Sequence, residues 1–240
     1  MIFIPWRVKN FISERWPLAY HLVANCFRNQ NSKEHWDAAL ARTWNAPNRE
    51  WPIKVAALAD ALPRDAALVD VGCGTGSILR ALRGLGFTDL HGLELSEYAV
   101  TRLSNEGIPM SQGTLLNMPF PDGRFDAVIA SEVLEHVIRR RRFLRELTRI
   151  VKPNGVVLIF VPDDYLGPID EPEHVIKYNA ESLRKFLSNF LSVESVTSMI
   201  EPHTGARSLF AVCRNGRCEV LGAKPVKTLA PPATADARAA

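Results

Sequence analysis

The chain has 240 residues, of which 47% are hydrophobic, and a formal net charge of +3 at pH 7. This length favours one domain with extensions, and the apolar content is ample for a core. The small net charge gives no global signal for nucleic-acid binding. The four cysteines (Cys26, Cys73, Cys213 and Cys218) form no Cys-x-x-Cys pair and no cluster with histidine, so we expect no metal site.

No stretch reaches the roughly 18–20 apolar residues of a membrane-spanning helix. The first residues lack the pattern of a signal peptide, because their apolar run is short and the charges follow it. We therefore expect a cytoplasmic protein. The sequence leaves its oligomeric state open.

Residues 1–50 are expected to form an N-terminal helical extension. Apolar residues between positions 10 and 27 follow roughly helical spacing, which Pro17 interrupts. Within residues 1–20, aromatic side chains alternate with arginines and lysines. Such a segment either packs over a ligand cleft as a lid or makes peripheral contact with a membrane. The break at Pro17 and the short apolar face favour the lid.

Residues 51–222 show a regular alternation of strand and helix patterns, which predicts a doubly wound α/β fold with a mostly parallel sheet. We expect strands at 67–71, 90–94, 110–113, 125–130 and 155–161, followed by two closing strands at 191–200 and 208–213. We expect helices at 54–62, 77–84, 96–106, 139–151 and 179–188. Residues 223–240 are rich in alanine and proline and are expected to be a disordered tail.

The segment Leu68–Gly76 is the most informative part of the chain. Its apolar run ends in three glycines at alternate positions, Gly72, Gly74 and Gly76, just before a helix pattern. Glycine allows a sharp turn and a close approach of the backbone to a ligand, and the helix start offers free N–H groups. Eighteen residues after Gly76, the next apolar run ends in Glu94, a carboxylate placed to accept the hydroxyls of a ribose. The pattern indicates an adenosine-type cofactor.

The glycine run does not fit the dinucleotide fingerprint. Counted from either of its first two glycines, the last required glycine is replaced, by Ser77 or by Leu79. Starting at Asp70, the run resembles instead the Asp-x-Gly-x-Gly-x-Gly motif of class I S-adenosylmethionine-dependent methyltransferases. Met118–Val137, with its Pro-Phe-Pro-Asp-Gly turn and Leu-Glu-His segment, and Leu147–Phe160, with its Lys-Pro-Asn-Gly turn, resemble later segments of the small-molecule members.

The resemblance implies a seven-stranded Rossmann-like sheet whose last strand inserts antiparallel between the two strands before it. It implies S-adenosylmethionine as the cofactor. The implied cofactor-binding residues are Asp70, Gly72, Cys73, Gly74, Gly76, Glu94, Leu95, Thr114, Leu115 and Ser131. Thr114 stands where the family usually has the acid that holds the adenine amino group. Its hydroxyl or the backbone N–H of Leu115 would serve the ring instead.

Three residues are candidates for the acceptor side. His136 lies where the family's chain passes beside the methyl group, and it is either a general base or part of the packing of the turn. His174 and Tyr178 lie on a loop beyond the fifth strand, and they either line the acceptor pocket or anchor the loop. The run Arg139–Arg142 is either a solvated helix face or a contact for an anionic partner.

The resemblance implies methyl transfer to a small-molecule, sugar or lipid-linked acceptor at oxygen or nitrogen. The segment after the fourth strand reads Ser131-Glu132-Val133-Leu134 and lacks the Asn-Pro-Pro-Tyr type of motif of members that methylate bases or amides, so we expect no nucleic-acid partner. The alternative is a methyltransferase-like domain that binds the cofactor without catalysis, as a regulatory or scaffold subunit.

Overall fold

The computed structural model describes residues 6–25, 31–46, 52–163, 171, 173–201 and 205–216. Its α-helices are α1 (Trp6–Arg15), α2 (Pro17–Asn25), α3 (Lys33–Thr43), α4 (Pro52–Ala61), α5 (Ser77–Gly84), α6 (Glu97–Asn105), α7 (Arg140–Ile150) and α8 (Ala180–Leu187). Its strands are β1 (Leu68–Val71), β2 (Leu90–Glu94), β3 (Met110–Gln112), β4 (Phe125–Ser131), β5 (Val151–Pro162), β6 (Ser192–Ile200) and β7 (Arg207–Arg214). A short 3₁₀ helix, η1, spans Leu134–His136.

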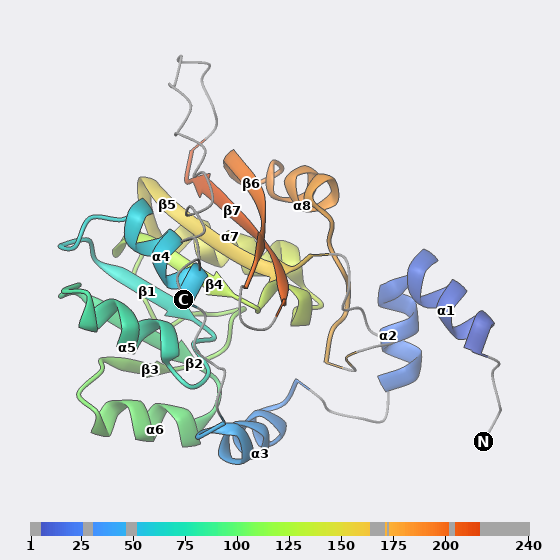
Figure 1. Cartoon of the computed structure of the whole chain (residues 1–240), viewed down its shortest axis with the longest axis horizontal. Helices are drawn as coiled ribbons and strands as arrows, with labels where there is room; N and C mark the ends of the chain where they lie inside the picture. The colour runs from blue at the N-terminus through green and yellow to red at the C-terminus, as the bar shows by residue number, and fades with distance from the viewer. Residues whose placement is uncertain are drawn as a thin grey trace, which may run out of the picture.

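The seven strands form one sheet in the order β3-β2-β1-β4-β5-β7-β6 (Figure 1). The pairs from β3 to β5 are parallel, whereas β7 lies antiparallel between β5 and β6. The expected doubly wound sheet with an inserted last strand is therefore confirmed. Its strand order reverses between β1 and β4, and ligands of open α/β sheets bind beside such a point at the carboxyl ends of the strands.

Helices cover both faces of the sheet, as the alternation along β1 requires. Leu68 joins a core with α4, α5 and α6, whereas Val69 and Val71 join a core with α7 and α8. In α7, the buried residues Phe143, Leu144, Leu147 and Ile150 recur at the spacing of one helix face. The sheet is thus buried on both sides, and its exposed carboxyl edge is left to carry function.

The fifth strand begins earlier than the sequence predicts. It starts at Val151, not at residue 155, because Val151 already pairs with Phe125. The pairing then jumps to Ala127 opposite Val156, so that the Lys-Pro-Asn-Gly turn forms an irregularity within the strand. Asn154 takes a left-handed conformation there, with φ of 61°. Asparagine tolerates this conformation better than most residues do.

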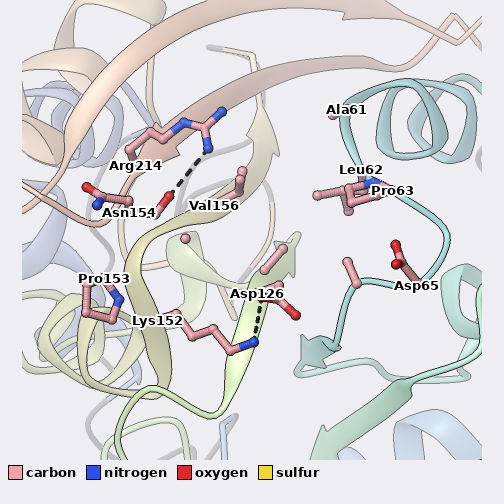
Figure 2. A pocket seen from close by; sticks show the side chains of 13 residues that line it. Ala61, Leu62, Pro63, Asp65, Asp126, Lys152, Pro153, Asn154, Val156 and Arg214 are labelled. Atoms are coloured by element: carbon pink, nitrogen blue, oxygen red, sulfur yellow. Dashed lines mark hydrogen bonds and ion pairs between the residues drawn. The ribbon is translucent and has the colours of Figure 1, made fainter. Parts of the chain in front are cut away.

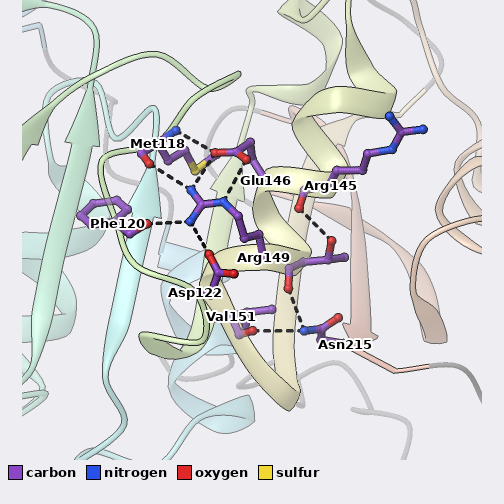
Figure 3. A network of polar contacts seen from close by, with 9 residues as sticks. Met118, Phe120, Asp122, Arg145, Glu146, Arg149, Val151 and Asn215 are labelled. Carbon is purple, nitrogen blue, oxygen red and sulfur yellow. Dashed lines mark hydrogen bonds and ion pairs between the residues drawn. The ribbon is translucent and has the colours of Figure 1, made fainter.

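A hydrogen-bonded network at the end of α7 fixes the turn that leads into β4 (Figure 3). Arg149 donates to the carbonyls of Met118 and Phe120 and to the carboxylates of Glu146 and Asp122. Arg149 of α7 therefore fixes the Pro-Phe-Pro-Asp-Gly turn through these hydrogen bonds. We read this network as structural, because its donors and acceptors satisfy one another.

The N-terminal helices lie beside the sheet domain and partly against it. The helix expected between residues 10 and 27 is divided at Trp16, so that α1 and α2 form a separate pair at one side of the molecule (Figure 1). The third helix, α3, packs along α6. Among the described residues, no helix is both long and apolar enough to cross a membrane. The expected tail at 223–240, together with Phe3, Cys26 and Cys218, lies outside the described residues.

Candidate functional site

The glycine turn after β1 leaves its middle residue open to a ligand. Gly72, Gly74 and Gly76 all have positive φ values, between 54° and 73°. A Cβ on Gly76 would lie 2.5 Å from Leu103, so this glycine is required for packing against α6. A Cβ on Gly74 would meet nothing nearer than Leu40 at 3.8 Å. The space above Gly74 is thus bounded by α3, not filled by the sheet domain.

The acid at the end of β2 is joined directly to this turn. Glu94 Oε2 accepts a hydrogen bond of 2.8 Å from the amide of Gly74, and Oε1 accepts from the amides of Leu95 and Ser96. Burial raises the pKa of Glu94, and these three N–H groups oppose that rise. A carboxylate has about four lone-pair sites. Three are used here, so one remains for a ligand hydroxyl, and a second hydroxyl must displace a backbone group.

Asp70 is buried beneath the glycine turn. Burial and the neighbouring charge of Glu94 raise its pKa to about 7, although Lys54 opposes the rise. Asp70 therefore changes charge near neutral pH, where an ordinary aspartate is fully ionised. Its placement at the end of β1 suits the loop-organising role implied by the resemblance.

An ion pair between a buried lysine and a half-buried glutamate, which sequence reasoning missed, lies at the end of β4. Lys54 is 1% exposed and donates to Glu132 over 2.5 Å and to the hydroxyl of Ser131 over 3.3 Å. Ser208 of β7 donates to the same carboxylate. Glu132 is held at a positive φ of 55°. The sequence did hold one signal for this pair. Lys54 lies on the same face of α4 as the apolar residues Ala57 and Leu58, and a lysine on a buried face needs an acidic partner.

The 3₁₀ turn after β4 gathers a second buried group. Glu135 is 1% exposed, and neither of its carboxyl oxygens has a hydrogen-bond partner among the described residues. One ligand atom each from Glu135, His136 and His174 lies within 4.8 Å of the others. The rings of His136 and His174 meet edge to face at 4.7 Å. The structure therefore brings two of the three acceptor-side candidates together with Glu135, the acid next to His136 in the sequence.

The third acceptor-side candidate, Tyr178, lies in the core. It is 2% exposed, and its hydroxyl accepts a 3.0 Å hydrogen bond from Arg140. Burial raises its pKa to about 12. Arg142, from the same run of arginines, donates to the carbonyl of Leu116. These contacts match the alternative in which Tyr178 anchors the loop. They also show that Arg140 and Arg142 make hydrogen bonds within the domain.

Of the remaining expected cofactor residues, the structure brings most to the same sheet edge. Ser131 ends β4 and Leu95 directly follows β2, and both are half-buried. Cys73 lies within the glycine turn, where burial raises the pKa of its thiol. Thr114 and Leu115 follow β3, with Thr114 exposed and bridged to Asn117. None of these placements identifies a bound group, so their assigned roles stay predictions.

The third helix, α3, covers this edge from the cofactor side to the acceptor side. Asp37 accepts from the hydroxyl of Ser96, over 2.6 Å, and from the amide of Tyr98, which attaches α3 to the start of α6. Trp36 meets His136 edge to face at 5.4 Å. Leu40 stands over Gly74. A single helix therefore touches the glycine turn, the end of β2 and the 3₁₀ turn.

The hollow on the opposite sheet edge is a separate feature (Figure 2). It has a volume of about 470 Å³ and is lined by the starts of β4 and β5. Most of its charged side chains are in ion pairs: Lys152 pairs with Asp126, and Arg214 pairs with Glu194, whereas Asp65 is exposed. We assign no function to it.

The middle of the chain matches a known family. Residues 69–159 match the family model described as a methyltransferase domain. Over these residues the chain is similar to that methyltransferase domain. Members of this family use S-adenosylmethionine as the methyl donor. The match runs from β1 through the glycine turn, Glu94 and the 3₁₀ turn into β5. It does not include α3, which bounds the space above Gly74.

Similar proteins act on different classes of acceptor. The tRNA (carboxymethyluridine(34)-5-O)-methyltransferase of Arabidopsis thaliana is 35% identical over 115 residues, which are 47% of this chain and 28% of that protein. The sterol 24-C-methyltransferase erg6 of Schizosaccharomyces pombe is 32% identical over 126 residues, which are 48% of this chain and 33% of that protein. The chain thus matches about a third or less of each relative's length.

A solved structure confirms the fold of the methyltransferase domain. The putative methyltransferase in the complex with the Trm112 methyltransferase activator of Haloferax volcanii superposes with a TM-score of 0.65. It covers 76% of this chain and 96% of that chain at 22% identity. At this identity the likeness extends to the fold alone.

Proposed function

We propose that this chain transfers a methyl group from S-adenosylmethionine to a small-molecule acceptor. The observation that carries the proposal is the pairing of Glu94 with the amide of Gly74 at the carboxyl edge of a methyltransferase domain. It puts a carboxylate for ribose hydroxyls beside a turn whose middle glycine is open. The ribose would lie at Glu94, and the methionine end would run past Gly72 and Asp70.

The main requirement of this reaction is that the protein holds the methyl donor and the acceptor in the correct relative position. The sulfonium carbon is already electrophilic, so holding the acceptor in line with it supplies much of the rate enhancement. His136 and His174, at the far end of this edge, are the proposed acceptor contacts. Burial and the neighbouring His174 lower the pKa of His136 to about 3. An imidazole of that pKa is a weak proton acceptor, so we assign His136 a contact role and not that of general base.

A small acceptor is favoured by the enclosure of this end of the site. Trp36 of α3 packs on His136, and the loop around Glu173 packs on its other side through a 3.2 Å contact between His136 Nδ1 and the Glu173 carbonyl. A base carried on a folded tRNA would have to enter past α3. The net charge of +3 also offers no general attraction for a polyanion.

We further infer that α3, and with it the N-terminal extension, acts as a lid. Its support is that Leu40 bounds the space above Gly74 while Asp37 holds the start of α6. The membrane alternative keeps some support from Phe11 of α1 and from Trp16, which directly follows α1, because both side chains are exposed. The cytoplasmic location expected from the sequence stays a prediction.

Methyl-labelled S-adenosylmethionine tests the function. The protein is incubated with the label and, separately, with a small-metabolite extract, a lipid extract or total tRNA, and Gly74→Val serves as the inactive control. We expect label in a small-metabolite or lipid fraction, with equimolar S-adenosylhomocysteine. Label in tRNA would contradict the acceptor class. Tight cofactor binding with no transfer to any fraction would favour a non-catalytic scaffold subunit.

A further inference from the structure

We propose that Glu135, His136 and His174 form a binding site for a divalent metal ion of the zinc type. The three residues come from two segments, η1 and the loop before α8, which are separated by almost forty residues in the sequence. The described structure brings one ligand atom of each within 4.8 Å of the others. The cysteine pattern gave no hint of a metal site, because the ligands are two histidines and a glutamate.

The first argument is the state of the Glu135 carboxyl group. It is almost completely buried, and both oxygens lack a hydrogen-bond partner among the described residues. The nearby ammonium of Lys54 is engaged with Glu132. A buried carboxylate without compensation is costly, so such a group either holds a proton or faces a cation. Two imidazoles beside it supply the further ligands that a cation would need.

The second argument is the tautomer of His136. Its Nδ1 lies 3.2 Å from the carbonyl oxygen of Glu173, which can only accept, so Nδ1 carries the proton. Nε2 then keeps its lone pair. A carbonyl that fixes one ring nitrogen and leaves the other free for a metal is the usual arrangement around ligating histidines.

The third argument is that main-chain bonds hold the two segments in register. The amide of Val175 donates to the carbonyl of Glu135 over 2.7 Å. The side-chain amide of Asn31 donates to the carbonyls of both His136 and Glu173. From α2, Nδ1 of His21 contacts the carbonyl of His174. The backbone positions of all three residues are therefore held by hydrogen bonds from other segments.

The ligand set selects the type of metal. Two imidazole nitrogens and one carboxylate suit zinc, which binds such atoms at roughly 2.0–2.2 Å and keeps a fourth position open in catalytic sites. All-oxygen ligation, which magnesium and calcium prefer, is absent from these three side chains. If the proposed methyl transfer is correct, the open position would face the acceptor side and could hold an acceptor oxygen.

Metal binding can be measured without the cofactor. The metal-free full chain is titrated with zinc against a chelating indicator, and cobalt replaces zinc to read the ligand geometry from its visible absorption. We expect one zinc ion per chain. Glu135→Gln and His174→Gln are each expected to weaken binding by at least about tenfold, since even partners outside the ligand shell change affinity by that much.

The matched control is His91→Gln, because His91 lies on β2 against Ser111 and the rings of Phe120 and Phe125, away from the cluster. It should bind zinc as the unchanged chain does. Circular dichroism checks that each variant is folded, and His174→Gln keeps the test valid if Glu135→Gln does not fold. Absence of stoichiometric zinc binding, or unchanged affinity in both cluster variants, would overturn the proposal. A separate titration with S-adenosylhomocysteine tests the proposed function by itself. Cofactor binding without zinc binding would contradict only the metal site, and zinc binding without cofactor binding would contradict only the proposed function.

Discussion

The carboxylate of Glu94 is bonded to the amide of Gly74 over 2.8 Å, so the acid at the end of β2 and the open glycine after β1 form one unit. Without a ligand, this carboxylate already organises the backbone of both loops, since Leu95 and Ser96 donate to its other oxygen. Ribose binding must therefore use the remaining acceptor site and exchange some of these bonds.

Replacing Glu94 should affect both binding and stability. Glu94→Ala removes the proposed ribose acceptor, which should weaken cofactor binding by about 1.5–3 kcal/mol. The substitution also leaves the N–H groups of Gly74, Leu95 and Ser96 without their acceptor. We therefore expect a lower free energy of unfolding as well, although Glu94 lies at the end of a strand. Calorimetry and urea denaturation measure the two effects. Glu181→Ala, an exposed acid in the first turn of α8, is the control, and equal cofactor affinity in both variants would exclude the role.

Breaking the ion pair between Lys54 and Glu132 should be destabilising. Lys54→Met leaves the carboxylate of Glu132 without its main partner, and the cost should be below the about 3–5 kcal/mol of fully buried pairs, because 29% of the Glu132 side chain is exposed. The double variant Lys54→Met with Glu132→Gln should recover part of this loss, because the charge of Glu132 is removed together with that of its partner. A double-mutant cycle by urea denaturation measures the coupling. Additive effects of the two substitutions would show that the pair does not act as a unit.

The raised pKa of Asp70 predicts a pH-dependent stability. Its folded pKa of about 7 lies above its unfolded value of about 3.9, so the folded state binds more protons between these two values. Stability relative to Asp70→Asn should therefore fall as pH rises through this window, by up to about 1.4 kcal/mol per pH unit, and level off above it. Urea titrations of both proteins across the window measure the difference. A difference that rises with pH would contradict the assigned pKa.

Two N-terminal changes separate the lid from the membrane contact. Deleting residues 1–30 removes α1 and α2 but keeps α3, so cofactor affinity should persist while acceptor binding weakens through the lost contact of His21 with the His174 carbonyl. Asp37→Ala detaches α3 from Ser96 and should weaken cofactor binding instead. Titration in solution measures both effects. Unchanged solution binding with lost sedimentation on anionic vesicles would favour the membrane contact.

The sequence predicted the sheet domain well because its signals are local. The alternation of strand and helix patterns placed six strands within one or two residues of their observed bounds. The start of β5 was wrong because Pro153 and Asn154 are typical of a turn, whereas the pairing of Val151 with Phe125 is a tertiary contact.

The candidate site was predictable only where it follows a motif. The glycine turn and Glu94 stand at strand ends, which the pattern predicts. The cluster of Glu135 with His174 depends on how the loop before α8 folds back onto η1, and no spacing along the chain encodes this contact. The position of Leu40 over Gly74 likewise arises from the packing of α3 on the finished domain.

The most direct test of the account is a calorimetric titration of the full chain with S-adenosylmethionine, S-adenosylhomocysteine and NAD. We predict binding of the first two and none of NAD, because the glycine turn lacks the last glycine of the dinucleotide fingerprint at Ser77 and Leu79. Gly74→Val, which would fill the space beside the open glycine, should abolish the binding. Comparable affinity for NAD, or undiminished S-adenosylmethionine binding in Gly74→Val, would contradict the proposed site.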